Sequence, residues 1–392
     1  MTYYGKGGFA AAGLVVSMLI GCAAQAQDFT LKTSGRVMID YAAVNANSGA
    51  KWDATELRRA RLGVSGQYGS NVKYKVEFNT NSSEDINVED AWVQFKPGAG
   101  KWKIKAGQFK TPNSLDEQTS SRFISTHERA SFTDAFGFDR RVGVAASTGG
   151  DNYSFTAGIF TTNLTNIDDE EGMAIAARAT YTPINTKETV VHLGASVRYR
   201  DQKNDGNIRY RQRPVSHIPG RIISTGSFAD KDTFYGVEAA AIMGKFWAAG
   251  EYGQTNANNA SGGTDGDFSG FYAEAGAFFG GRKTYKGHKF NRPKIDNPVT
   301  NGGYGALSLV ARYDALDLEG NAVNGGKLDS VVIGADWWPT KNTRLGVNYF
   351  NSDADLGTST SGLDSDFASL VTNPAITKES VDGFIARLQF DF

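Results

Sequence analysis

Apolar and polar side chains alternate through the last twelve residues of the chain. One face of this segment is apolar and ends on an aromatic residue, with Phe384, Ala386, Leu388, Phe390 and Phe392. The opposite face is polar, with Arg387, Gln389 and Asp391. A period of two predicts a β-strand, but a half-buried strand of a soluble protein has the same pattern. The rest of the chain must therefore indicate what covers the apolar face.

The same alternation recurs from end to end and predicts sixteen strands. They are 29–44, 55–67, 71–80, 87–96, 100–110, 140–148, 152–163, 173–183, 188–201, 232–243, 246–256, 268–279, 304–316, 328–338, 342–352 and 381–392. A closed antiparallel barrel with both chain ends on one side has an even number of strands. The count therefore favours such a barrel.

The first residues have the layout of a secretory signal, with Lys6, an apolar stretch over 9–20 and small residues up to Ala26. We expect residues 1–26 to be removed and residues 27–392 to form the barrel domain. The alternative is a lipoprotein site at Leu19–Cys22, which would leave Cys22 acylated. Cys22 is the only cysteine, so a chain cleaved after Ala26 has no disulfide and no cysteine metal site.

Composition agrees with a membrane barrel. No segment after the signal approaches the roughly 18 consecutive apolar residues of a membrane helix, and the mean hydropathy is −0.37. The chain has 46 Gly, 24 Phe and 16 Tyr but only 9 Pro, which suits strands, turns and aromatic girdles. We therefore predict an all-β, sixteen-stranded antiparallel transmembrane barrel in the outer membrane of a Gram-negative cell, in contact with its lipid.

The connections between the strands differ in length. If both chain ends are periplasmic, the long connections 111–139, 202–231 and 353–380 are extracellular. Connection 280–303 is long but falls on the periplasmic side, so either a strand has been missed or this mouth carries a basic insertion. We expect connection 111–139 to fold inward and narrow the channel, with four phenylalanines packing it against the wall: Phe123, Phe132, Phe136 and Phe138.

The distribution of charge, rather than the net charge of −1, points to anions. Arginines fall on the predicted inner face or in loops, and Arg donates a planar pair of hydrogen bonds to oxyanions. Those placed on the anion pathway include Arg36, Arg59, Arg61, Arg209, Arg211, Arg213 and Arg221. Lysines gather toward the periplasmic side: Lys73, Lys75, Lys103, Lys105, Lys283, Lys286, Lys289 and Lys294. The alternative for the lysines is ordinary solvated turn charges, and Asp90 could weaken anion binding or simply pair with arginines.

Catalysis has little support in the sequence. The four histidines, His127, His192, His217 and His288, lie in separate elements, and no hydrolase, metalloprotease or phosphate-loop motif is present. We therefore predict no enzyme activity, no cofactor, no metal site and no nucleic-acid partner.

Three stretches carry a resemblance to a known family: Glu56 to Arg61, Glu89 to Val93, and Gly107 to Pro112 continuing through Arg122 to Ala130. The chain resembles the phosphate-selective porin O and P family of trimeric sixteen-stranded channels. The resemblance implies that Arg36, Arg58 and Arg59 are pore arginines, that Asp90 is the constriction acid and that Arg209, Arg211 and Arg213 form a loop ladder. It places Arg122 where family members have lysine and favours a true insertion at 280–303.

Two points depart from that pattern. By strict alternation Arg58 falls on the lipid face, so either a bulge turns it inward or its side chain snorkels. Connection 111–139 is also rather acidic. We therefore expect a homotrimeric channel for passive diffusion of small anions, phosphate or a related oxyanion. The alternatives are a general non-selective diffusion porin and a non-conducting structural or adhesive barrel.

Overall fold

The structure is a computed structural model that describes residues 29–82, 85–164, 172–203, 208–259, 265–321, 323–373 and 375–392. The predicted signal over 1–26, with Cys22, lies outside the described residues. Among the helices that are described, none is long and apolar enough to cross a membrane.

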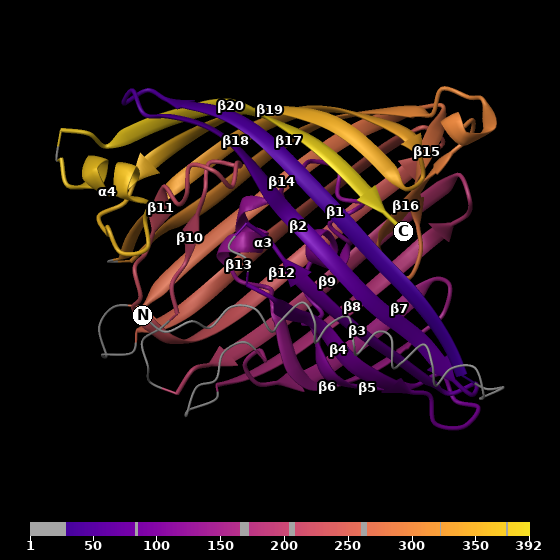
Figure 1. Ribbon diagram of the computed structural model, residues 1–392. Coiled ribbons are helices and arrows are strands. Elements are labelled where there is room, and N and C mark those ends of the chain that lie inside the picture. Colours follow the sequence, from indigo (N-terminus) through magenta and orange to yellow (C-terminus); the bar gives the residue numbers. More distant parts are fainter. Residues whose placement is uncertain are drawn as a thin grey trace, which may run out of the picture.

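Sixteen antiparallel strands close into a barrel, in which β1 pairs with both β2 and β20 (Figure 1). The strands are β1 (Phe29–Ala46), β2 (Lys51–Tyr68), β3 (Val72–Thr80), β4 (Asn87–Phe95), β5 (Lys103–Lys110), β6 (Arg140–Gly149), β7 (Tyr153–Phe160), β8 (Met173–Asn185), β9 (Thr189–Asp201), β12 (Ala229–Met243), β13 (Phe246–Asn259), β14 (Gly266–Phe279), β17 (Ala306–Gly320), β18 (Val323–Thr340), β19 (Thr343–Leu356) and β20 (Lys378–Asp391). Each predicted segment overlaps one of these strands. The predicted barrel is confirmed.

Alternate residues of each strand face opposite sides of the wall. In β20, Leu388 and Phe390 are exposed on the outer face, whereas Arg387 and Gln389 are buried on the inner face. Arg387 is only 3% exposed, so it is a lumen residue as predicted. The terminal Phe392 continues the ladder, because its amide and carbonyl both bond to Gly35 at 3.1 and 3.2 Å.

A bulge between β1 and β2 settles the position of Arg58. Met38 pairs with Arg59 and Ile39 pairs with Leu57, so Arg58 is the extra residue of β2. An extra residue shifts the alternation by one position. The side chain of Arg58 consequently turns inward, where it reaches Glu128 rather than lipid. Of the two alternatives, the bulge is correct.

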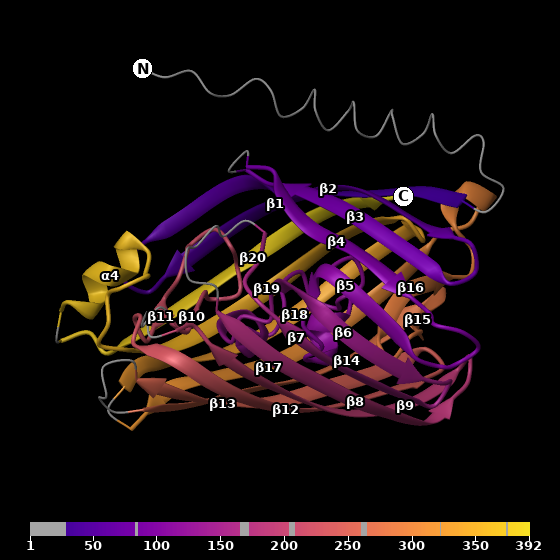
Figure 2. The same cartoon turned by 90° about the horizontal axis from the view of Figure 1, so that it is seen from below.

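The long connection between β14 and β17 is an insertion and not a missed barrel strand. It forms a separate two-stranded sheet of β15 (Gly281–Tyr285) and β16 (Phe290–Ile295), followed by a short 3-10 helix, η2 (Val299–Asn301). The connection between β9 and β12, here called loop 5 (residues 202–228), also holds a small sheet, β10 (Arg211–Gln212) with β11 (Ile223–Ser224). The views in Figures 1 and 2 place these two small sheets at opposite ends of the barrel.

Three short helices complete the described structure. α2 (Leu115–Gln118) and α3 (Ser131–Ala135) belong to the connection between β5 and β6, called loop 3 (residues 111–139), and α4 (Ser365–Val371) lies between β19 and β20. α3 contacts the wall strands β14 and β17, and Figure 1 labels it among the barrel strands. The contacts of loop 3 are therefore with the inner face of the barrel wall.

Candidate functional site

Loop 3 is held by side chains from strands far around the barrel. Glu251 of β13 accepts hydrogen bonds from the amides of Leu115 and Asp116 at 2.8 and 2.7 Å, at the start of α2. Asp314 of β17 accepts one from the amide of Ser131 at 2.8 Å, at the start of α3. A carboxylate suits both positions because the first amides of a helix lack partners within it.

Buried arginines of the wall bind the carbonyl groups of the same loop. Arg198 donates to Phe136 and Gly137, Arg344 to Ile124 and Ser125, and Arg387 to His127, over 2.6–3.1 Å. These arginines come from β9, β19 and β20. Three of the four predicted phenylalanines pack against rings of the wall: Phe138 lies 4.6 Å and Phe136 5.9 Å from Phe234, and Phe132 lies 6.4 Å from Tyr272, measured between ring centroids.

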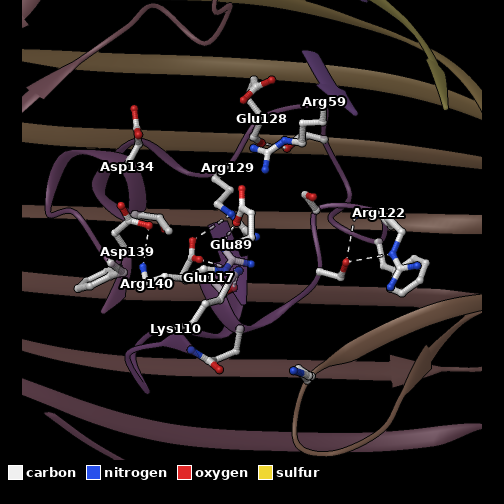
Figure 3. Close-up of a pocket in the computed structure, with 18 of the residues that line it drawn as sticks. Arg59, Glu89, Lys110, Glu117, Arg122, Glu128, Arg129, Asp134, Asp139 and Arg140 are labelled. Atoms are coloured by element: carbon white, nitrogen blue, oxygen red, sulfur yellow. Dashed lines mark hydrogen bonds and ion pairs between the residues drawn. The ribbon is translucent and has the colours of Figure 1, made fainter. Parts of the chain in front are cut away.

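A cavity of about 810 Å³ lies between loop 3, the β15–β16 hairpin, loop 5 and the wall. Thirteen of its lining residues are Lys or Arg and eight are Asp or Glu, an excess of five positive charges. Figure 3 shows labelled side chains of both signs pointing toward this common space. The excess gives the cavity a positive potential, which raises the local concentration of anions.

Most of the lining cations are ion-paired. Arg36 lies 3.6 Å from Glu77, and Arg61 lies 3.4 Å from the same carboxylate. Asp90 contacts Lys75 at 2.6 Å and Arg140 at 2.8 Å. This geometry matches the alternative in which Asp90 is a partner of wall cations.

Arg58 and Glu128 join the wall to loop 3. Two hydrogen bonds of 2.8 and 2.7 Å connect the guanidinium of Arg58 to the carboxylate of Glu128. Arg387 lies 3.0 Å from the same carboxylate. Burial alone would raise the pKa of Glu128, but Arg58 and Arg387 hold it well below its usual range. Glu128 therefore stays ionised and neutralises part of the charge of both arginines.

Three lining cations have no ion pair within the described residues: Arg59, Lys105 and Lys289. Arg59 lies among Arg58, Arg61 and Arg129, and the carboxylate nearest to it, Glu128, is already bound by Arg58 and Arg387. The ammonium of Lys105 lies 4.5 Å from the ring centroid of Trp92. Among the described residues, these three are the lining cations whose charge no ion pair offsets.

The predicted loop arginines divide into two groups. Arg213 and Arg221 contact Asp134 of loop 3 at 3.4 and 2.6 Å, and Arg213 also lines the cavity. Arg211 donates to the carbonyl of Gly362 at 3.2 Å, and Arg209 is exposed. Neither Arg209 nor Arg211 lines the cavity, so the predicted ladder reaches it only at its inner end.

The predicted lysines differ in their exposure and in whether they line the cavity. Lys75, Lys105 and Lys289 line the cavity, whereas Lys73, Lys103, Lys286 and Lys294 are exposed. Lys283 is 5% exposed and lies 3.7 Å from the ring centroid of Trp247. Arg122 lines the cavity and lies 3.3 Å from Asp391.

Other lining residues were not predicted. Lys110 and Arg129 pair with Glu117 at 2.6 and 3.0 Å, and Arg140 opens β6. Lys110 and Arg140 flank loop 3 directly, and that position was a signal, since a loop that returns into a barrel brings its ends to the lining. No group of three or more His, Cys, Asp or Glu side chains in the described part of the chain could hold a metal ion.

A closed sixteen-stranded barrel with an apolar outer face and a charged inner face is the architecture of an outer-membrane porin, a channel rather than an enzyme. The family model of phosphate-selective porin O and P matches residues 31–392, and the chain belongs to this family. A protein of Caulobacter vibrioides described only as uncharacterized is 35% identical over 342 residues, which cover 82% of this chain and 68% of that relative.

Solved structures agree on the fold. An anion-selective porin from Comamonas acidovorans is 16% identical, with a TM-score of 0.60 over 93% of this chain and 100% of that one. The outer-membrane-expressed OmpT of Vibrio cholerae is 15% identical, with a TM-score of 0.59 over 94% of this chain and 99% of that one. At such identities the likeness extends to the barrel alone.

Proposed function

We propose that this porin passes small anions by passive diffusion through the outer membrane of a Gram-negative cell, and that it prefers phosphate or a related oxyanion. The observation that carries the proposal is the cavity lining, with its excess of five positive charges and its three cations without an ion pair. Loop 3, tied to the wall, narrows the lumen at Arg59, and Lys105 and Lys289 follow it along the pathway. Conduction requires binding that is favourable enough for entry but weak enough for exit.

Planar bilayer recordings test this proposal. In a gradient of potassium chloride, the reversal potential is expected to report a preference for chloride over potassium. Millimolar phosphate is expected to reduce the chloride current, because a dianion competes for the same three cations. A preference for potassium contradicts the anion pathway, and an unchanged current in phosphate contradicts the oxyanion preference.

General diffusion without selectivity is the second candidate. Ten of the thirteen lining cations lie in an ion pair with a carboxylate, several of them sharing one, and such pairing favours this alternative. Non-selective diffusion predicts a large conductance, a reversal potential near zero and no block of the current by phosphate. The same recordings therefore separate the two candidates.

The proposed assembly is a homotrimer. Strands β3 to β7 have only 8–10 residues, whereas the other barrel strands have 13–18. At a tilt near 45°, nine residues span roughly 21 Å, less than the apolar band of about 25 Å. A neighbouring copy of the chain that covers β3 to β7 would shield these short strands, so that they need not span the apolar band of the membrane. One OmpT structure of Vibrio cholerae is described as a trimer form. Light scattering of the detergent-solubilised protein is expected to give three copies.

The anion preference is expected to depend on pH through Lys289. Burial lowers the pKa of Lys289 to about 8, and repulsion by Lys105 and Arg178 adds to the effect. The ammonium is charged at pH 7 and mostly neutral at pH 9, so the ratio of anion to cation permeability is expected to fall between these values. Reversal potentials measured across this range provide the check.

The matched control for this titration is Lys289→Arg, because a guanidinium remains charged throughout the same range. The variant is expected to keep its anion preference at pH 9. A flat wild-type profile, or an equally steep profile in Lys289→Arg, contradicts the assignment of the titration to Lys289.

A further inference from the structure

The β15–β16 hairpin crosses from one side of the barrel to the other. Near its tip, Tyr285 contacts His192 of β9, and the carbonyl of His288 accepts a hydrogen bond from Arg178 of β8. Nearer its base, Arg292 binds Asp391 at the end of β20. The hairpin is thus attached to wall strands on both sides of its own point of origin between β14 and β17.

The attachment at Tyr285 is a chain of hydrogen bonds that ends on a buried carboxylate. The hydroxyl of Tyr285 lies 2.6 Å from Nδ1 of His192 and 3.1 Å from the hydroxyl of Thr182. Nε2 of His192 lies 2.8 Å from Glu238, and His192 is fully buried. In the tautomer that carries its hydrogen on Nε2, His192 donates a hydrogen bond to Glu238, and the lone pair on Nδ1 accepts one from the Tyr285 hydroxyl.

The turn after Tyr285 is strained and needs this support. Gly287 and His288 both have positive φ, 63° and 59°, as the two central residues of a tight type I′ hairpin turn do. A residue other than glycine rarely adopts this conformation, and such a site persists only when its surroundings hold it. His288 is held by Gly150, whose carbonyl accepts from Nε2 at 3.1 Å.

Lys289 comes directly after this strained turn, and it lines the cavity without an ion pair to any described residue. Its position therefore depends on the tip and not on a barrel strand. We propose that Tyr285, bound to His192, is a positioning residue of the channel: it fixes the hairpin tip and so holds the ammonium of Lys289 in the anion pathway. This inference rests on the proposed function, because it presumes an anion pathway through the cavity.

A double-mutant cycle tests the inference, because only coupled residues depart from additivity. The four proteins are the wild type, Tyr285→Phe, Lys289→Gln and the double variant. Removal of the Lys289 charge is expected to lower the anion-to-cation permeability ratio by roughly two- to fourfold, given one unit charge near the ion path. Tyr285→Phe retains the ring and loses only the hydroxyl, and it is expected to give a similar loss. In the Lys289→Gln background, Tyr285→Phe is expected to change nothing further.

Controls separate positioning from folding. Tyr304→Phe removes a hydroxyl from a tyrosine that is 92% exposed and should leave the ratio unchanged. His192→Phe removes the acceptor from the other side and should reproduce Tyr285→Phe, which keeps the test usable if one variant folds poorly. Thermal unfolding of each purified barrel checks that the wall is intact.

The outcomes distinguish two failures. A wild type without anion preference overturns the proposed function itself. If the wild type prefers anions, the inference is overturned when Lys289→Gln has no effect, when Tyr285→Phe keeps the wild-type ratio, or when the effects of the two substitutions add.

Discussion

Arg59→Glu is expected to abolish the preference for anions and to produce a preference for cations. Within the part of the chain that the structure describes, Arg59 is the lining arginine without an ion pair, and the substitution changes the charge at that point by two units. Two unit charges acting on an ion about 5 Å away in water are worth roughly 1.7 kcal/mol. The ratio of anion to cation permeability should therefore fall by about tenfold or more at low salt, and less at 1 M salt, where screening is strong.

The fold should tolerate this substitution. Arg58, Arg61 and Arg129 surround Arg59, so a carboxylate at this position gains partners and relieves repulsion. Reversal potentials at 0.1 M and 1 M potassium chloride measure the effect. Lys231→Glu makes the same change of charge on the outer side of β12 and should leave the ratio nearly unchanged. Equal effects of Arg59→Glu and Lys231→Glu would show that the local charge at Arg59 does not control selectivity.

The barrel was predictable because period-two alternation is a local property of each strand. Phe390 and Arg387 reveal their faces from a few neighbouring residues, and the register then brings Asp40 opposite Arg387 as β1 closes on β20. Strict alternation placed Arg58 on the wrong face, because a bulge depends on pairing between strands and has no signature in the local sequence. The sequence offered a bulge and a snorkelling side chain as two alternatives for Arg58. The register between β1 and β2 was needed to decide between them.

The ion-pair partners of the lumen side chains could not be predicted from the sequence. Arg36, Arg61 and Arg59 look alike as lumen arginines, yet the first two bind Glu77, whereas Arg59 has no ion pair among the described residues. Which arginine is free depends on the distances between side chains of different strands and loop 3. For the same reason the sequence did not distinguish Lys289, which lines the cavity, from Lys283, which is buried against the ring of Trp247.

Glu251 is another residue that the sequence did not single out. Its removal is expected to loosen loop 3. Its carboxylate, 6% exposed, accepts from the amides of Leu115 and Asp116 and from the hydroxyls of Ser114 and Tyr272. Glu251→Ala leaves these four donors without their acceptor. A buried donor left without an acceptor costs about 1–3 kcal/mol, so the loss of the two amide bonds alone represents about 2 kcal/mol or more of anchoring.

The readout is the single-channel current. If α2 helps to narrow the lumen, Glu251→Ala is expected to raise the unitary conductance and the noise of the open channel, and to expose loop 3 to limited proteolysis. Glu251→Gln keeps one carbonyl oxygen as acceptor and should give an intermediate result. The effect should be confined to the first part of the loop, because Arg198, Arg344 and Arg387 still hold its later part. Unchanged conductance, noise and proteolysis in Glu251→Ala would mean that these remaining contacts suffice to fix the whole loop.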